Sequence, residues 1–135
     1  MKRVLVDANV FLRFFTVDDA GQHERAAKLF RAAAEGSLAL IVGPPVLFEV
    51  AWTLRAAYLR TPAQVLDVLE AILSLPGLSF TDAAVCAQAL RLARSSGVEF
   101  PDAYIAALAE VCGADVVATF NLADFRRLGV RCHAL

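Results

Sequence analysis

Cysteine and histidine are scarce in this sequence, which argues against two common kinds of site. The three cysteines are an odd number, stand far apart and form no C-x-x-C pair, so neither a disulfide framework nor a zinc site is indicated. We expect all three to be reduced core residues; they are Cys86, Cys112 and Cys132. The two histidines, His23 and His133, lie outside the acidic motifs described below, which leaves no Ser–His or Cys–His pair for nucleophilic catalysis.

Long apolar runs, a secretion signal and a net basic charge are also missing. The longest apolar run, Leu38 to Phe48, is broken by Gly43-Pro44-Pro45 and is too short to cross a bilayer. Met1-Lys2-Arg3 leads straight into a strand pattern, without the apolar segment or cleavage site of a signal peptide. We therefore expect a cytoplasmic protein that has no membrane partner. Because the net charge is −1, any binding of nucleic acid would depend on a local patch of cations.

Apolar residues, by contrast, are abundant and make up 59% of the 135 residues. This share favours a well-filled core over disorder, and the length predicts a single domain over residues 1–135. So many apolar residues on a small chain also indicate that a partner covers part of the surface.

Strand-like and helical segments alternate along the chain. Strands are expected at residues 3–6, 38–42, 78–80, 115–119 and 130–132. Helices are expected within residues 8–15, 18–36, 46–59, 61–75, 82–97 and 101–113, with a short one within 121–129. Gly36 and Gly97 are helix stops, and Thr61-Pro62-Ala63-Gln64 is a capping box with proline at the first helical position. Strands separated by helices predict right-handed β-α-β units, and so a three-layer α/β/α fold with a central parallel sheet of four to five strands.

Two carboxylates in the first half of the chain call for an explanation. Asp7 follows Val4-Leu5-Val6 at the carboxyl end of the first strand, where open α/β sheets gather ligands, although it could also simply cap the next helix. Glu49 has apolar neighbours on its helix face and no nearby cation, so burying it would be costly without a distant partner. The alternative for Glu49 is a place at the helix rim, reaching solvent.

Three polar residues in the second half resemble these two in their placement. Asp102 lies in the first turn of its helix, where the helix dipole alone would favour an acid. Asn121 and Asp124 follow the strand at 115–119, where they could also be a turn residue and a helix cap. Thr119, at the end of that strand, could orient a neighbouring carboxylate. Asp115 lies at the opposite end of the strand and is excluded from the candidate site.

The predicted topology brings these acids toward one edge of the sheet. Carboxylates gathered in one pocket repel each other, and their pKa values rise unless a cation neutralises them. Oxygen ligands without histidine or cysteine suit Mg²⁺ or Mn²⁺. The residues therefore predict a divalent-metal site of the kind that serves phosphoryl chemistry.

Four blocks of the sequence resemble the PIN-domain family, and more narrowly the VapC-type toxins of bacterial toxin–antitoxin pairs. In order they read VLVDANVFLRFF, PVLFEVAWTL, FPDAYIAALAE and VVATFNLADF, and together they span most of the chain. The resemblance implies a PIN-like fold, a Mg²⁺- or Mn²⁺-dependent endoribonuclease, a homodimer, and an antitoxin that occupies the active-site groove. It makes Asp7, Glu49 and Asp102 the family's first three acids.

The fourth family position falls on Asn121, where many relatives have aspartate. This leaves open whether one or two metals bind, and whether Asp124 compensates or only anchors its loop. The resemblance implies that Asp7 and Asp102 bind the metal directly. Glu49 would bind it through water or help to deprotonate the attacking water, and Asn121 would hold a water or a substrate oxygen.

Substrate contacts and competing functions remain to be weighed. Arg13 and Arg55 are the candidate phosphate contacts, although each could be an ordinary solvated helix charge, and Thr119 is a further candidate for substrate contact. Five aromatic residues could stack on unpaired RNA bases or belong to the core or a dimer interface: Phe11, Phe14, Phe15, Trp52 and Tyr58. A haloacid-dehalogenase-type phosphatase expects D-x-D, but Asn9 replaces its second acid, and the acidic pair and lysine of a receiver domain are missing. The remaining alternative is a degenerate PIN domain that binds RNA or a partner protein without catalysis.

Overall fold

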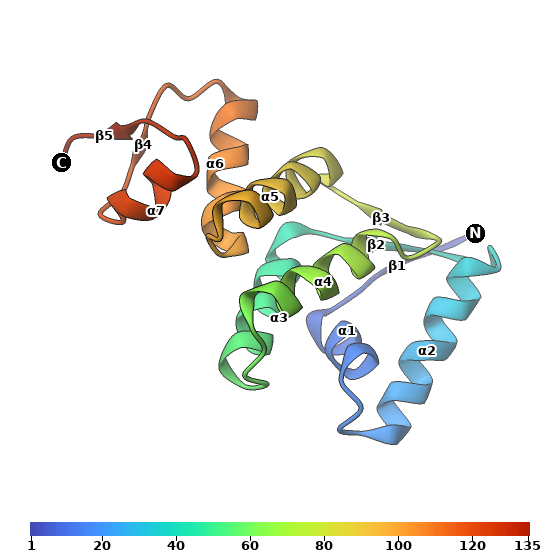
Figure 1. The fold of residues 1–135 in the computed structure, drawn as a ribbon. Coiled ribbons are helices and arrows are strands. Elements are labelled where there is room, and N and C mark those ends of the chain that lie inside the picture. The colour runs from blue at the N-terminus through green and yellow to red at the C-terminus, as the bar shows by residue number, and fades with distance from the viewer. The chain divides into compact units, whose positions relative to one another are not determined.

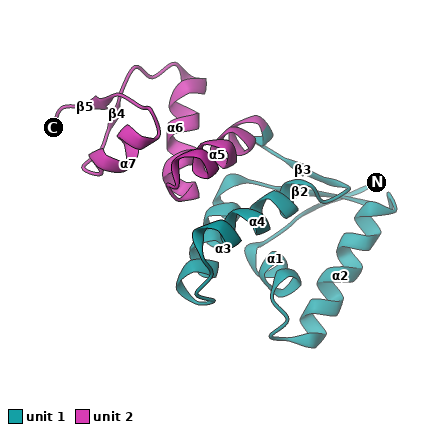
Figure 2. Ribbon diagram, in the orientation of Figure 1, with its two compact units in different colours: residues 1–83 teal, residues 84–135 magenta.

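Three parallel strands form the sheet of the N-terminal part of the chain (Figure 1). The computed structural model describes residues 1–135, which divide into unit 1, residues 1–83, and unit 2, residues 84–135 (Figure 2). In unit 1 the strands lie in the order β1-β2-β3; their bounds are Lys2–Leu5, Leu38–Val42 and Leu78–Phe80. Lys2 is paired with Leu38, and Leu40 with Leu78. The central strand β2 is therefore the one whose side chains are most enclosed, and Leu40 and Val42 are fully buried.

Two helices follow each of the first two strands. They are α1 (Ala8–Phe15) and α2 (Ala20–Ala34) after β1, and α3 (Pro44–Ala56) and α4 (Pro62–Leu73) after β2. Helix α1 packs against both α2 and α3, and α3 packs against α4. Each parallel connection thus passes through a helix pair that covers the sheet with its apolar side.

Local signals in the sequence account for where these helices begin and end. The Thr61 hydroxyl accepts a hydrogen bond from the backbone of Gln64, whose side chain accepts one from the backbone of Thr61, so the predicted capping box is confirmed. Asp19 caps α2 by accepting from the backbone of Gln22. Gly36 follows α2 with a φ of 82°, a conformation that glycine adopts without the steric cost of a side chain.

Aromatic and aliphatic side chains from these elements form the core of unit 1. Phe11 of α1 is fully buried and stacks on Phe30 of α2, with ring centroids 5.6 Å apart. Phe14 packs edge-on against the same ring at 4.8 Å. The other fully buried large side chains of this unit are Leu40, Leu47, Leu54, Leu69, Ile72, Val6, Val42 and Val50.

Unit 2 contains most of α5 (Ala83–Ser96), then α6 (Phe100–Cys112), α7 (Leu122–Arg127) and two short strands. The strands, β4 (Val117–Ala118) and β5 (Cys132–His133), pair in parallel. Helix α6 ends at Gly113, whose φ of 72° is left-handed. Helix α7 packs against both α6 and β5, and Phe125 is its buried side chain.

The predicted α/β class with parallel strands is confirmed, but two details differ. All five expected strands are present, yet three form one sheet and two form another instead of a single sheet of four to five. The β4 and β5 strands have only two residues each and so few backbone hydrogen bonds to hold a wider sheet. Burial alternates along the first strand: Val6 is buried, whereas Arg3 and Leu5 lie on the opposite face and Leu5 is 73% exposed.

The prediction of a single domain over residues 1–135 stays a prediction, since the structure divides by its contacts into two units. None of the helices combines the length and the apolar character that crossing a bilayer requires.

Candidate functional site

The clearest polar cluster of the candidate residues lies in unit 2. The Asn121 side-chain amide donates to the Asp102 carboxylate at 3.1 Å and to the Asp124 carboxylate at 2.8 Å. One nitrogen thus bridges two acids that are 22 residues apart along the chain. The structure therefore brings together the three polar residues that the sequence singles out in this half.

Local structure explains how each member of this cluster is placed. Asp102 lies in the first turn of α6, behind Pro101, whose missing N–H costs nothing at a helix start. Asn121 precedes α7 as its N-cap residue, although its side chain is turned to the two acids and makes no capping hydrogen bond. The backbone N–H of Asn121 donates to the Thr119 hydroxyl at 2.9 Å. Thr119 therefore fixes the Asn121 backbone, instead of contacting a carboxylate directly.

The electrostatics of the cluster centre on Asp102, which is half-buried. Burial raises the pKa of Asp102 above its ordinary value, and the negative charges of Asp124 and, to a smaller extent, Glu99 raise it further. The hydrogen bond from Asn121 acts in the opposite direction because it stabilises the ionised carboxylate. The pKa remains raised because burial and the neighbouring negative charges outweigh this hydrogen bond.

Asp124 has a second partner that connects it to its own helix. Its other carboxylate oxygen lies 3.6 Å from the Arg127 guanidinium, one turn along α7. Arg127 in turn donates to the Ser96 carbonyl at 2.6 Å, at the end of α5. Asp124 is thus held on one side by Asn121 and on the other by an arginine with a fixed position.

Asp7 lies in unit 1, at the junction of β1 and α1. Val6 donates to the Ile41 carbonyl at 2.9 Å, which extends the strand pairing up to the residue before Asp7. The Asp7 carboxylate is exposed and accepts from the Ala8 backbone at 2.8 Å as the N-cap of α1. The capping role considered from the sequence is therefore present, and a second carboxylate oxygen remains for a ligand.

Glu49 is exposed on α3, so the cost of burying it does not arise. Every third or fourth residue on this side of the helix is also exposed: Pro45, Glu49, Trp52 and Ala56. Trp52, one turn after Glu49, is 70% exposed. Glu49 thus has the apolar neighbours that the sequence indicates, but it lies on an outward-facing stripe of the helix.

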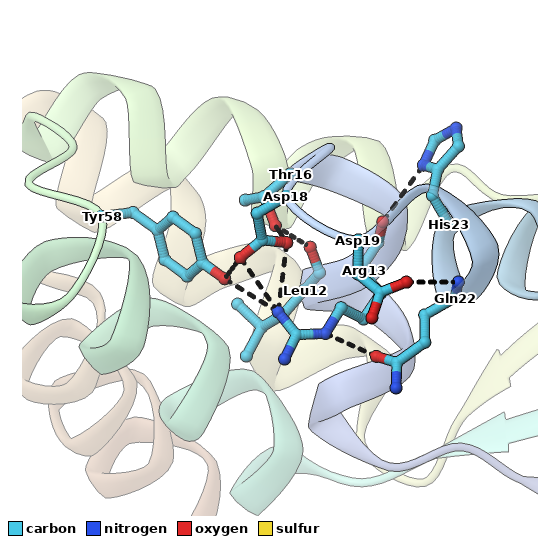
Figure 3. A network of polar contacts seen from close by, with 8 residues as sticks. All are labelled: Leu12, Arg13, Thr16, Asp18, Asp19, Gln22, His23 and Tyr58. Atoms are coloured by element: carbon cyan, nitrogen blue, oxygen red, sulfur yellow. Dashed lines mark hydrogen bonds and ion pairs between the residues drawn. The ribbon is translucent and has the colours of Figure 1, made fainter.

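Arg13, a predicted phosphate contact, is the centre of a polar network within unit 1 (Figure 3). Its guanidinium donates to the Asp18 carboxylate at 3.0 Å, to the Tyr58 hydroxyl at 3.2 Å and to the Gln22 side chain at 2.7 Å. Tyr58 also donates to Asp18 at 2.7 Å. The hydrogen bond from Tyr58 and the charge of Arg13 lower the pKa of Asp18. Arg13 therefore joins α1 to the start of α2 and to the segment after α3.

The other candidates for substrate contact also have partners inside the protein. Arg55 donates to the Arg60 carbonyl at 2.8 Å, so it closes the turn after α3. Two further charged residues belong near the candidate groups although the sequence does not single them out. Glu99 lies near Asp102, as its effect on the pKa shows, and Arg25 lines a groove beside α1. No local motif marks Arg25, because the groove exists only once α1 and α2 pack together.

The donor set of the Asp102–Asn121–Asp124 cluster fits a hard divalent cation in its chemistry. It offers two carboxylates and an amide without histidine or cysteine, and a cation placed beside Asp102 and Asp124 would offset the repulsion between them. Mg²⁺ usually binds through one or two carboxylates and keeps several waters. The structure contains no group of three or more His, Cys, Asp or Glu side chains placed to hold a metal ion.

Comparison with known proteins identifies the family. No match is found among curated proteins. The family model of the PIN domain matches residues 4–130, which span both units and all four sequence blocks. PIN domains are generally metal-dependent nucleases that act on RNA. The chain therefore belongs to the PIN domain family.

Proposed function

We propose that this protein is a Mg²⁺- or Mn²⁺-dependent endoribonuclease and the toxin of a VapBC-type toxin–antitoxin pair. The observation that carries the proposal is the Asp102–Asn121–Asp124 cluster in a chain whose PIN match covers both halves. In this cluster an acid with a raised pKa lies beside a second acid. A divalent cation would offset the repulsion between the two carboxylates. The proposed place of action is the cytoplasm.

Asp7, Glu49 and Asp102 are the proposed metal-binding acids, and Asp124 is a further ligand or an anchor of its loop. A divalent metal supplies activation of water and neutralises charge on the phosphate. Asp7 offers an exposed carboxylate at the end of a paired strand, and Glu49 offers one that is exposed on α3. Glu49 would bind the metal through a water or help to deprotonate the attacking water. Asn121 would hold a water or a substrate oxygen through its amide.

The proposed partners are an RNA substrate, a second copy of the chain and an antitoxin protein. The high apolar content and the exposed Trp52 side chain support a surface that is covered by another molecule. The antitoxin would bind over the same acids and so block cleavage.

A second candidate function is a degenerate PIN domain that binds RNA or protein without cutting. The specific observation in its favour is the Asn121 amide, which donates a hydrogen bond to each of the two carboxylates that a metal would bind. Asn121 also stands where many relatives have an acid, so one ligand for a second metal is missing.

Cleavage of total cellular RNA by the purified protein tests the proposal. It would be run with Mg²⁺, Mn²⁺ or EDTA, and with Asp7→Asn beside the unaltered chain. The matched control is Asp115→Asn, an exposed acid outside the candidate site. Discrete fragments that need metal and Asp7 but not Asp115 support the nuclease. A folded protein, free of antitoxin, that cuts RNA with none of the metals would shift the assignment to the binding module.

A further inference from the structure

A groove on the surface of unit 1 lies between α1 and α2. Its volume is about 420 Å³. The residues that line it are Asn9, Val10, Arg13, Gln22, Arg25, Ala26 and Leu29. All seven belong to these two helices, which pack directly against each other, so the groove is a property of unit 1 alone.

The lining has two chemical parts. Val10, Ala26 and Leu29 give an apolar floor, of which Ala26 is buried. Two arginines and two side-chain amides give the polar part. No aspartate or glutamate lines the groove, although the chain as a whole is slightly acidic. The groove is therefore a local cationic site of the kind that a chain with a net charge of −1 needs in order to bind an anion.

The two arginines differ in how far they are available to a ligand. Asp18 is paired with Arg13 at 3.0 Å and offsets its charge, while Tyr58 and Gln22 fix its orientation (Figure 3). Arg25 is exposed and forms neither an ion pair nor a side-chain hydrogen bond. Arg25 thus supplies the net positive charge of the groove. Arg13 is held in a fixed orientation at its side and still has guanidinium N–H groups that could donate to a ligand.

The groove begins close to a proposed catalytic acid. Asn9 and Val10 lie in the first turn of α1, the helix that Asp7 caps. An anion held in the groove would therefore lie near the carboxyl end of β1.

We propose that this groove binds the RNA strand next to the cleaved phosphodiester. Arg25 contacts a backbone phosphate, and the apolar floor contacts a ribose or an unpaired base. Single-stranded RNA fits this lining because it presents phosphates and apolar ring faces alternately. The inference rests on the proposed function and adds to it a substrate-binding surface.

Binding of a fluorescein-labelled, mixed-sequence single-stranded RNA, followed by anisotropy in EDTA over a range of salt concentrations, tests the groove. Arg25→Ala is compared with Lys28→Ala, which removes a charge from the same helix outside the groove. If Arg25 contacts one phosphate, Arg25→Ala lowers the slope of log affinity against log salt by about 0.7, and Lys28→Ala leaves it unchanged. Arg25→Lys keeps the charge and should restore the slope. Melting curves confirm that each variant folds.

The outcomes separate the groove from the nuclease. Equal slopes for Arg25→Ala, Lys28→Ala and the unaltered chain would overturn the groove proposal, whether or not the protein cuts RNA. If the unaltered chain binds no RNA at all in EDTA, the groove proposal fails, and the cleavage assay with Mg²⁺ or Mn²⁺ decides the nuclease separately. Normal RNA binding by Arg25→Ala, together with loss of a co-purifying antitoxin, would assign the groove to a protein segment and overturn its role in RNA binding.

Discussion

The side-chain amide of Asn121 donates to Asp102 at 3.1 Å and to Asp124 at 2.8 Å, so one neutral group separates two acids. The two hydrogen bonds from this amide offset part of the repulsion between the two carboxylates. An aspartate at the same position would be a third negative charge in place of the donor. The identity of residue 121 therefore decides how strongly this half of the site depends on a cation.

The first prediction concerns that residue. Asn121→Asp should lower the free energy of unfolding in EDTA more than Asn121→Ala, because both lose the hydrogen bonds but only the aspartate adds repulsion. The loss for Asn121→Ala should be about 1 kcal/mol, since the cluster is partly exposed. Mg²⁺ should then raise the melting temperature of Asn121→Asp more than that of the unaltered chain. Equal responses to Mg²⁺ in all three proteins would contradict this role of Asn121.

The second prediction follows from the raised pKa of Asp102. In the pH window above the ordinary aspartate value of about 4, the folded state keeps a proton that the unfolded chain has lost. This contribution to stability is complete below that value, and it is lost as the pH rises through the raised pKa. The side chain at position 102 cannot ionise in Asp102→Asn. The melting temperature of this variant should therefore increase relative to that of the unaltered chain as the pH rises toward neutral.

The control for this measurement is Asp115→Asn, which changes an exposed acid elsewhere in unit 2. Asp18 works in the opposite direction, because its pKa is lowered and its contribution is lost as the pH falls. It is present in every variant of the comparison and so cancels. A constant difference in melting temperature between Asp102→Asn and the unaltered chain would refute the prediction.

The third prediction separates core aromatic residues from surface ones. Phe11→Ala should cost about 3–5 kcal/mol in the free energy of unfolding, because Phe11 is fully buried and stacks on Phe30. Trp52→Ala should change it by no more than about 0.5 kcal/mol, because the indole is mostly exposed. Urea unfolding of both variants measures the difference. A large loss for Trp52→Ala at low protein concentration would show that the indole is packed in the protomer.

The fourth prediction compares two glycines with the same backbone conformation. Gly77 and Gly113 have φ values of 76° and 72°. A Cβ on Gly77 would overlap the Ala33 carbonyl oxygen, whereas a Cβ on Gly113 would meet nothing within 4 Å. Gly113→Ala should therefore cost about 1 kcal/mol for the left-handed conformation alone. Gly77→Ala should cost clearly more, and similar melting temperatures for the two variants would contradict the close approach.

Structural features that depend on neighbouring residues in the sequence were predicted correctly. The capping box at Thr61, the stops at Gly36 and Gly97 and the helix from Ala8 to Phe15 each depend on a few neighbouring residues, and the structure has all of them. The placement of Asn121 and Asp124 after a strand end is similarly local. These features are predictable because the backbone and its nearest side chains determine them.

Features that depend on distant partners were not predictable in the same way. Arg13 lies next to the Asp7 motif, yet its partner Tyr58 is 45 residues away and belongs to the segment after α3. The exposure of Leu5 depends on which face of β1 the rest of the chain covers, and the groove at Arg25 depends on how α1 packs against α2. In each case the deciding contact comes from tertiary packing, which sequence periodicity does not encode.

Each unit also contains one side chain that can serve as a fluorescence probe or as the attachment site for one. Trp52 is the one tryptophan of the chain and lies in unit 1. Cys112 in unit 2 is an exposed thiol, so the expectation that all three cysteines are core residues is wrong for it. Cys86 is buried and so protected from alkylating dyes in the folded state, and Cys132→Ser removes the remaining accessible thiol. Energy transfer from Trp52 to an acceptor on Cys112 would then follow the separation of the two units during urea unfolding. Compared with the circular dichroism of the helices, it would show whether the two units melt together or one after the other.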